Sequence, residues 1–141
     1  MSVKEEKSVA AIVYHNNEYL LLKYGLGHWE FVKGHIEEGE TEDETIMREL
    51  EEETGIRAAH IVQGFKEGYD YSFKFKGKKI YKTVICYLIE SHTKDVEISY
   101  EHEDYKWLPI DKAIKQVTYK NAKELLKKAN KFRSSSLALF L

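Results

Sequence analysis

Three glutamates in the first half of the chain have a spacing suited to binding a metal ion. Glu49, Glu52 and Glu53 lie three and four residues apart, so at about 100° per residue their carboxylates stand on one side of a helix. Carboxylates this close repel one another, at a cost of about a few tenths of a kcal/mol per neighbouring pair even in water. A divalent cation reverses that cost. Oxygen ligands suit Mg²⁺, with Mn²⁺ as an alternative, and either ion also binds substrate phosphates.

Arg48 lies one helical turn from both Glu44 and Glu52. We therefore expect its guanidinium to orient a carboxylate, in preference to contacting phosphate directly. The competing interpretation is that the whole acidic run is an ordinary solvated helix face, as most charge runs are. That interpretation explains neither the glycine-marked loop before the helix nor its cap nor the placement of the glutamates on one side.

The helix that carries these residues has clear start and stop signals. Thr41 followed three residues later by Glu44 is a capping box, and Gly55 occupies the position where a left-handed C-terminal residue is expected. The pattern predicts a helix from Thr41 to about Thr54, preceded by the loop GHIEEGE at 34–40.

Residues 34–56, GHIEEGETEDETIMRELEEETGI, resemble the Nudix box, whose pattern is G-x5-E-x7-R-E-U-x-E-E-x-G-U with U aliphatic. A chance match at a given start is on the order of one in 10^9 at ordinary residue frequencies. The specified positions are all matched, by Gly34, Glu40, Arg48, Glu49, Leu50, Glu52, Glu53, Gly55 and Ile56. The resemblance implies an α/β (α+β) fold, an α/β/α sandwich with a mixed central sheet, and Mg²⁺-dependent cleavage of nucleoside diphosphate derivatives.

Three further stretches resemble the asymmetrical diadenosine tetraphosphate hydrolases, which yield ATP and AMP. They are GHWEFVKGHIEEGE, GFKEGYDYSF, and YKTVICYLIE with the later EHEDYKWL. The chain departs from that family at Val32, where proline is usual, and at Tyr71, which follows Ile56 by fifteen residues and implies a slightly shorter loop. A Nudix box alone fixes the chemistry and not the substrate, so nucleoside triphosphates, capped RNA 5′ ends and nucleotide sugars are alternatives.

The second resemblance also implies contacts to phosphate. Lys33, His35 and Lys82 are candidate phosphate ligands, because four phosphates carry more charge than one magnesium ion cancels. Plain solvation is the alternative for the lysines. His28 and His35 could instead satisfy backbone groups of the loop.

Aromatic and acidic residues outside the box complete the candidate site. Tyr71, Tyr87 and Tyr105 are candidates to stack on adenine, with core or sheet packing as the alternative for each. Glu101 matches a family position that often adds a carboxylate from a separate loop, and the backbone carbonyl of Lys33 is a further expected metal ligand. Among the glutamates, Glu49 is the favoured general base, although sequence does not separate a base from a ligand.

The remaining segments predict strands around this helix. The runs 8–15 and 18–25 read as a hairpin turning at Asn16 and Asn17, and 28–32 as a short strand. Further strands are expected at 58–65, 69–75, 80–90 and 104–110, with a turn at Gly77 and Lys78 and an end at Pro109. A C-terminal helix is indicated by the core-facing spacing of Ala122, Leu125, Leu126 and Ala129.

Composition limits the remaining possibilities. A chain of 141 residues suits one domain spanning 1–141, and a net charge of -2 disfavours general nucleic-acid binding. No run is apolar enough for a membrane span or a signal peptide, so a cytoplasmic protein is expected. Cys86, the only cysteine, is expected in the core.

Two matters stay open at this level. A non-catalytic Nudix nucleotide-binding module is the rival from another functional class, but such modules tend to lose box glutamates and this box is complete. The apolar C-terminal segment FRSSSLALFL, 132–141, is expected either to dock on its own domain or to contact a partner, which leaves a monomer or a weak homodimer.

Overall fold

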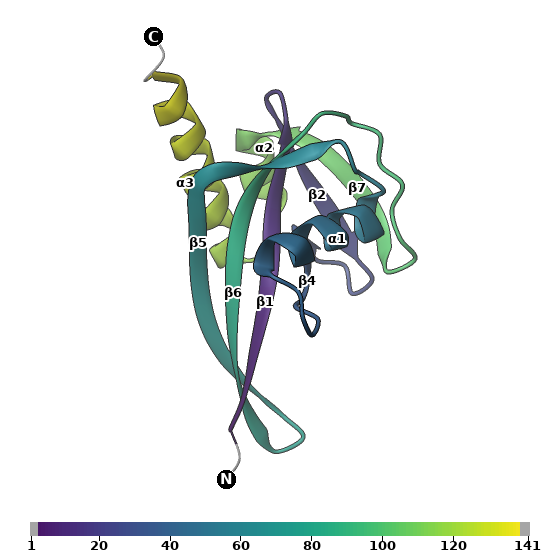
Figure 1. Ribbon diagram of the computed structural model, residues 1–141, viewed down its shortest axis with the longest axis vertical. Helices are drawn as coiled ribbons and strands as arrows, with labels where there is room; N and C mark the ends of the chain where they lie inside the picture. The colour runs from purple at the N-terminus through teal and green to yellow at the C-terminus, as the bar shows by residue number, and fades with distance from the viewer. Residues whose placement is uncertain (1–2, 139–141) are drawn as a thin grey trace.

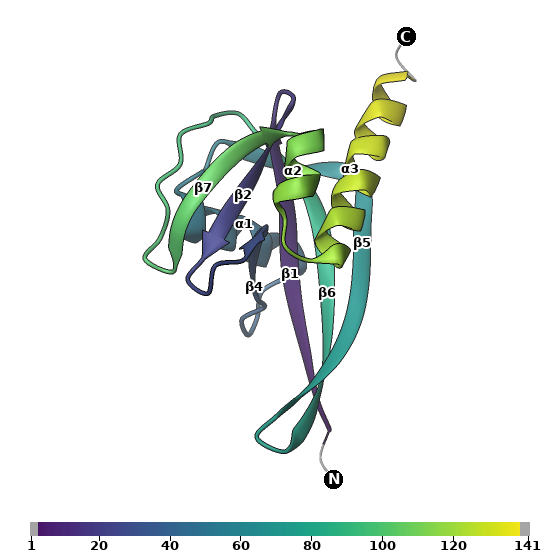
Figure 2. The same cartoon turned by 180° about the vertical axis from the view of Figure 1, so that it is seen from behind.

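The computed structural model describes the backbone of residues 3–138 and the side chains of residues 3–135. A seven-stranded mixed sheet lies between helix α1 on one face and helices α2 and α3 on the other (Figures 1 and 2). The elements are β1 Val3–His15, β2 Glu18–Tyr24, β3 Trp29–Glu30, β4 Val32–His35, α1 Glu42–Thr54, β5 Ala59–Phe75, β6 Lys78–Ser91, β7 His102–Pro109, α2 Ile110–Gln116 and α3 Lys120–Ala138. The predicted layered fold with a mixed sheet is confirmed.

Strand β1 is the centre of the sheet. It runs parallel to β6 from the pair Val3↔Lys79 to the pair Tyr14↔Glu90. Its other edge pairs antiparallel with β2 and with β4, and β7 continues the sheet beyond β2. Because β4 leads directly into the loop before α1, the start of the Nudix box is hydrogen-bonded to the most central strand.

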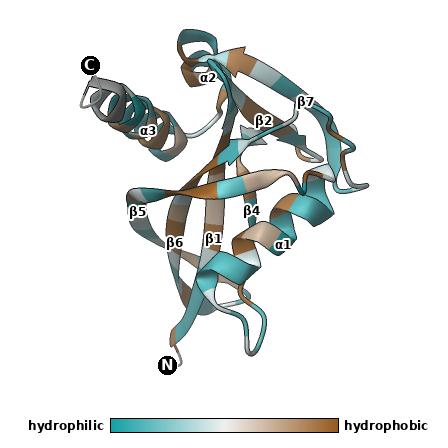
Figure 3. Ribbon diagram, turned by 45° about the horizontal axis from the view of Figure 1, so that its top comes forward, coloured by the Kyte–Doolittle hydropathy of each residue, from teal (hydrophilic) through white to brown (hydrophobic). Residues whose placement is uncertain are grey.

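Alternate residues of β1 serve the two cores. Val9, Ala11 and Val13 pack on the α1 side, whereas Ala10, Ile12 and Tyr14 pack on the α3 side. Both faces are covered, which explains the unbroken apolar run that the sequence shows here. The same continuity appears as brown in the middle of β1 and β6 in Figure 3. Cys86 is fully buried in the α3-side core, as predicted.

Helix α1 forms as its sequence signals predict. The Thr41 hydroxyl accepts from the Glu44 N–H at 3.1 Å, the Glu44 carboxylate accepts from the Thr41 N–H at 3.0 Å, and Gly55 ends the helix at φ 76°. Ile46 and Leu50 are fully buried against the sheet. This packing fixes the rotation of the helix. Contrary to the prediction that the three glutamates share the side opposite Ile46 and Leu50, Glu52 is exposed whereas Glu53 is buried, because Glu53 follows Leu50 by one helical turn.

Strand β5 differs from the prediction. The two runs expected at 58–65 and 69–75 form one strand, Ala59–Phe75, whose pairing with β6 is interrupted by an irregularity between Ile61 and Lys66. Gly64 lies inside this irregularity at φ +95°, where the ring of Phe132 comes within 3.2 Å of the space a Cβ would fill. The bulge therefore bends the strand without ending it.

Three smaller boundaries also differ. The predicted strand 28–32 is split at Phe31, because β3 pairs with β2 while β4 pairs with β1. The turn expected at Gly77 and Lys78 lies at Lys76 and Gly77, whose positive φ values of 50° and 76° fit a type I′ hairpin. Helix α2 was not predicted, since seven residues are too few to show a helical period.

Helix α3 carries the first part of the C-terminal segment. The Phe132 ring meets Phe65 edge-on at a centroid distance of 5.7 Å, and the Arg133 guanidinium lies 3.6 Å from the centre of the Tyr14 ring. These contacts agree with docking on the chain's own domain. The side chains of 136–141 lie outside the described residues. Within the described part, no helix combines the length and apolarity needed to cross a membrane.

The cap of α1 predicts a measurable loss of stability. Replacing Thr41 with alanine leaves the Glu44 N–H without its acceptor, so Thr41→Ala should lower the free energy of unfolding by about 1 kcal/mol. Thr41→Ser, which keeps the hydroxyl, should stay close to wild type. Urea denaturation measures both, and equal losses in the two variants would contradict the assigned cap.

Candidate active site

Arg48 joins the loop and the helix of the box. Its Nε and Nη2 donate to the two carboxylate oxygens of Glu40 at 2.6 and 3.0 Å, a bidentate pair. Its Nη1 donates to Glu49 at 2.9 Å and to Glu52 at 3.1 Å, and Nη2 also donates to the His35 carbonyl at 3.2 Å. Arg48 therefore orients carboxylates. Its bidentate partner is Glu40 in the loop, whereas Glu44, one turn away on the helix, takes part in the capping box instead.

Gly34 makes room for Glu49. A Cβ at Gly34 would lie 2.1 Å from the carboxylate carbon of Glu49, which real atoms never approach. The backbone conformation of Gly34 is unexceptional, so the constraint is steric and not torsional. A side chain at the first glycine of the box would therefore force the Glu49 carboxylate to shift.

Glu53 is buried between the helix and the sheet, with 4% of its surface exposed. One carboxylate oxygen accepts from the Lys33 N–H at 3.3 Å. The other lies 3.4 Å from the Tyr24 hydroxyl and 3.1 Å from Nε2 of His102. That ring nitrogen is itself fully buried and out of line for a hydrogen bond, so Glu53 receives few donors for a buried anion.

The surroundings of Glu53 disfavour its charge. Burial raises the pKa of Glu53 well above the usual carboxyl range, and the adjacent Glu49 and the charge of Glu101 raise it further. By contrast, the Arg48 guanidinium lowers the pKa of Glu40 to about 2. The box therefore contains a carboxylate whose ionised form is favoured by arginine and another whose ionised form is disfavoured by burial and by neighbouring carboxylates.

A cavity of about 570 Å³ lies in front of these carboxylates. Its walls are Lys33, Gly34, His35, Glu37, Glu49, Glu52, Glu53, Ser99, Tyr100 and Glu101. The structure thus brings the three box glutamates together with Glu101 from the loop before β7. Glu37 also lines the cavity, so five carboxylates face it, and oxygen donors of this kind suit a hard divalent cation.

A second cavity, of about 500 Å³, adjoins the first through Lys33. It is lined by His28, Glu30, Lys33, Tyr69, Tyr71, Tyr119, Lys120, Asn121 and Ala122. We call these the carboxylate cavity and the aromatic cavity. Lys33 pairs with Ala10, whose side chain faces the α3 side, so its own side chain points away from α1.

Of the predicted phosphate ligands, Lys33 and His35 line the carboxylate cavity, whereas Lys82 lines neither of the two cavities. His35 lines the carboxylate cavity and its Nδ1 is 3.4 Å from the Ser8 hydroxyl. Lys82 is the cross-strand partner of Tyr71. Partial burial and the charge of Lys33 lower the pKa of Lys82.

Two predicted stacking residues lie elsewhere. The hydroxyl of Tyr87 donates to Glu42 at 2.6 Å under the first turn of α1, so its ring is part of the helix packing. Tyr105 packs against the α1-side core from β7. Neither tyrosine lines the aromatic cavity, and both rings take part in the packing that was the alternative interpretation for them.

Sequence reasoning missed several residues of the site. Tyr119 enters the aromatic cavity from the turn before α3, and no sequence signal marks it. The His28 ring lies between Tyr24, stacked at 4.8 Å, and Tyr119, tilted at 5.5 Å. His102 follows Glu101 in the EHEDYKWL segment and lies beside Glu53. The resemblance that indicated Glu101 could therefore also have indicated His102.

Comparison with known proteins agrees with this geometry. Residues 4–129 match the NUDIX domain, and the chain belongs to the Nudix family. With the complete box and the assembled carboxylates, it is a Nudix hydrolase, a class that generally acts with divalent metal ions.

Several similar proteins carry the same activity in their names. The asymmetrical bis(5′-nucleosyl)-tetraphosphatase of Rattus norvegicus is 38% identical over 125 residues, covering 86% of this chain and 84% of its own. That of Sus scrofa is 39% identical over 127 residues with the same coverage. The crystal structure of a binary complex of the C. elegans Ap4A hydrolase has a TM-score of 0.81 at 31% identity, covering 92% of this chain and 98% of its own.

The contact at Gly34 predicts the effect of a single methyl group. Gly34→Ala should displace the Glu49 carboxylate while leaving the core intact, and so reduce kcat by about 10²-fold. Gly25→Ala is a matched control, because a Cβ there meets nothing within 4 Å. Steady-state hydrolysis and circular dichroism measure the two effects; a fully active Gly34→Ala enzyme would refute the proposed clash.

The burial of Glu53 predicts a pH-dependent stability without metal. Its pKa is raised by folding, so the folded chain retains a proton that the unfolded chain loses above about pH 4.3, and the free energy of unfolding falls as the pH rises from there towards the raised pKa. Glu53→Gln should remove this component in chelator-treated protein. Denaturation at several pH values measures it.

Glu51→Gln provides the control for this experiment, since Glu51 lies on the same helix with half of its side chain exposed. Its curve should run parallel to that of the wild type. A Glu53→Gln curve that also runs parallel would show that Glu53 is ionised at low pH despite its burial.

Proposed function

We propose that this chain hydrolyses diadenosine tetraphosphate asymmetrically, giving ATP and AMP, in a Mg²⁺-dependent reaction. The observation that carries the proposal is the junction at Lys33, where a carboxylate cavity suited to metal and phosphate adjoins an aromatic cavity suited to a base. The names of the similar proteins support the same substrate.

The residues that would hold Mg²⁺ are Glu49, Glu52, Glu53, Glu101 and the backbone carbonyl of Lys33. The raised pKa of Glu53 supports this assignment, because the charge of a nearby cation would stabilise the ionised carboxylate against burial and the repulsion of Glu49. When bound, the ion supplies neutralisation of phosphate charge and lowers the pKa of a coordinated water. Mn²⁺ would fit the same oxygen ligands.

The chemical step requires a proton acceptor near the attacked phosphorus. The oxygen of water forms a new bond to phosphorus, the bridging P–O bond to the leaving phosphate breaks, and the proton of the water passes to a carboxylate. We assign this role to Glu49, whose position is fixed by Arg48 and by its contact with Gly34. Arg48 is a positioning residue in this scheme.

The remaining substrate contacts follow from the cavity walls. Lys33 and His35 line the carboxylate cavity, and Lys82 is paired with Tyr71 of the aromatic cavity. All three would contact the phosphate chain, whose charge exceeds what one divalent ion neutralises. Tyr71 and Tyr119 line the aromatic cavity and would stack on adenine. Stacking discriminates weakly among bases, so specificity would come mainly from the length of the phosphate chain.

Other Nudix activities make different predictions for the same site. Hydrolysis of nucleoside triphosphates, capped RNA 5′ ends or nucleotide sugars would not produce ATP and AMP from diadenosine tetraphosphate. A binding module without activity would retain nucleotide affinity with no turnover. A localisation in the cytoplasm and a monomer or weak homodimer without membrane or general nucleic-acid partners complete the proposal.

A product assay with one pair of variants tests the substrate. Wild-type protein with Mg²⁺ should convert diadenosine tetraphosphate to equal amounts of ATP and AMP in preference to the alternative substrates. Tyr71→Ala should raise KM about tenfold or more with a smaller change in kcat, because stacking contributes about 1–3 kcal/mol per base.

Tyr81→Ala is the control for the tyrosine variant, since Tyr81 is similarly exposed but on the opposite side of the same strand pair from Tyr71. It should leave KM unchanged. Two molecules of ADP as products, no turnover, or equal effects of the two tyrosine variants would each count against the proposed substrate placement.

A further inference from the structure

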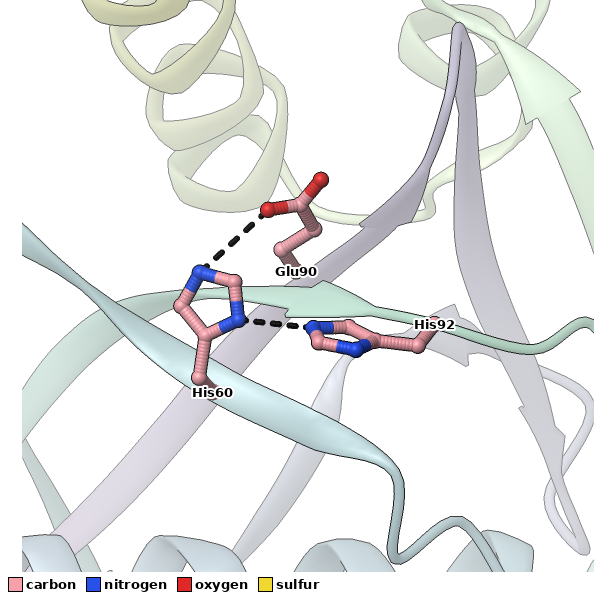
Figure 4. Close-up of side chains that lie close together, drawn as sticks. All are labelled: His60, Glu90 and His92. Atoms are coloured by element: carbon pink, nitrogen blue, oxygen red, sulfur yellow. Dashed lines mark hydrogen bonds and ion pairs between the residues drawn. The ribbon is translucent and has the colours of Figure 1, made fainter.

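A second group of metal-binding side chains lies away from the box. His60, Glu90 and His92 each place one ligand atom within 4.8 Å of the others (Figure 4). Nδ1 of His60 is 2.8 Å from Nε2 of His92, and Nε2 of His60 is 3.3 Å from a carboxylate oxygen of Glu90. The ring-to-ring contact requires one nitrogen to donate and the other to accept, so an imidazole lone pair already faces the group.

The backbone holds all three residues in position. His60 on β5 and Glu90 on β6 are directly paired in the antiparallel register, so their side chains stand next to each other on one face. His92 follows Glu90 by two residues and points to the same side. Its N–H donates to the Ala58 carbonyl at 2.7 Å, which fixes the chain just beyond the strand.

We propose that His60, Glu90 and His92 form a binding site for Zn²⁺ or a similar transition-metal ion. Two imidazoles and one carboxylate suit such ions, whereas Mg²⁺ prefers oxygen ligands throughout. Two nitrogens about 2.0–2.1 Å from a tetrahedral zinc lie about 3.4 Å apart, so the rings need to separate only slightly from their present contact. The half-exposed side chains leave the fourth position to water.

This site is separate from the carboxylate cavity. Glu90 pairs with Tyr14 across the β1–β6 ladder, and Tyr14 belongs to the α3-side core. His60 lies between Ala59 and Ile61, which both pack on the α1 side, so its own side chain takes the other face. The sheet therefore stands between the proposed zinc site and the glutamates of α1, and the proposal does not depend on the substrate.

A metal ion at this site would connect the first residues of β5, which have few pairing partners, to β6. Only Ala59, His60 and Ile61 of β5 pair with β6 before the irregularity that ends at Lys66. A metal ion shared by both strands would hold this segment against β6. The expected consequence is slower local opening of the stretch that follows the end of α1.

Zinc titration in the presence of excess Mg²⁺ tests the site, because Mg²⁺ would compete for the oxygen ligands of the box. One equivalent of Zn²⁺ should shift the ring ¹⁵N resonances of His60 and His92 and leave those of the buried His102 unchanged. The double variant His60→Gln and His92→Gln should bind Zn²⁺ more weakly by at least about tenfold in isothermal titration calorimetry.

Matched variants separate this result from a general effect. Glu124→Gln removes an exposed carboxylate from α3 and should leave zinc affinity unchanged, whereas Glu90→Gln should weaken it. All these positions are at the surface, so the variants should fold and retain Mg²⁺-dependent hydrolysis. Unshifted His60 and His92 resonances, or equal zinc affinity in the wild type and the double histidine variant, would overturn the proposal.

Discussion

The guanidinium of Arg48 holds the loop and helix of the Nudix box in one arrangement, and the rest of the site depends on it. It binds Glu40 from the loop in bidentate fashion, contacts Glu49 and Glu52 on the helix, and donates to a carbonyl of β4. The surrounding carboxylates raise the pKa of Arg48, so the charge is permanent. One cation thus allows several carboxylates to converge in a small volume, at a distance where they would otherwise repel.

Among the three box glutamates of the carboxylate cavity, Glu53 is the one that Arg48 does not contact, and its environment differs from that of the others. Glu53 lies deeper, beside Tyr24 and His102, where burial and Glu49 disfavour its charge. If these carboxylates hold a divalent cation, as proposed, the folded chain already carries the cost of gathering the ligands. Helix α1 does not depend on these charges for its stability, because the buried side chains of Ile46 and Leu50 and the capping box at Thr41 hold it in place.

The sequence predicted the parts of the molecule whose constraints are local. The helix ends followed from Thr41, Glu44 and Gly55. The box glutamates lie on that helix, but the burial of Glu53 did not follow from their spacing. The misplaced residues were those set by packing between distant segments. Tyr87 lies under α1 because Glu42 accepts its hydroxyl, and Tyr119 joins the aromatic cavity only because α3 crosses that face of the sheet. Neither contact produces a periodic pattern in the sequence from which it could have been predicted.

The alternation of side chains along β4 places Lys33 between the two cavities and fixes how far apart they lie. Its backbone borders the carboxylate cavity while its side chain turns to the aromatic one, and pairing with Ala10 forbids slippage by a single residue. In a substrate that spans both cavities, the thickness of one strand sets how many phosphates separate the anchored base from the bond that breaks. The asymmetry of the products would then be a property of backbone geometry, inherited by any sequence that preserves this register.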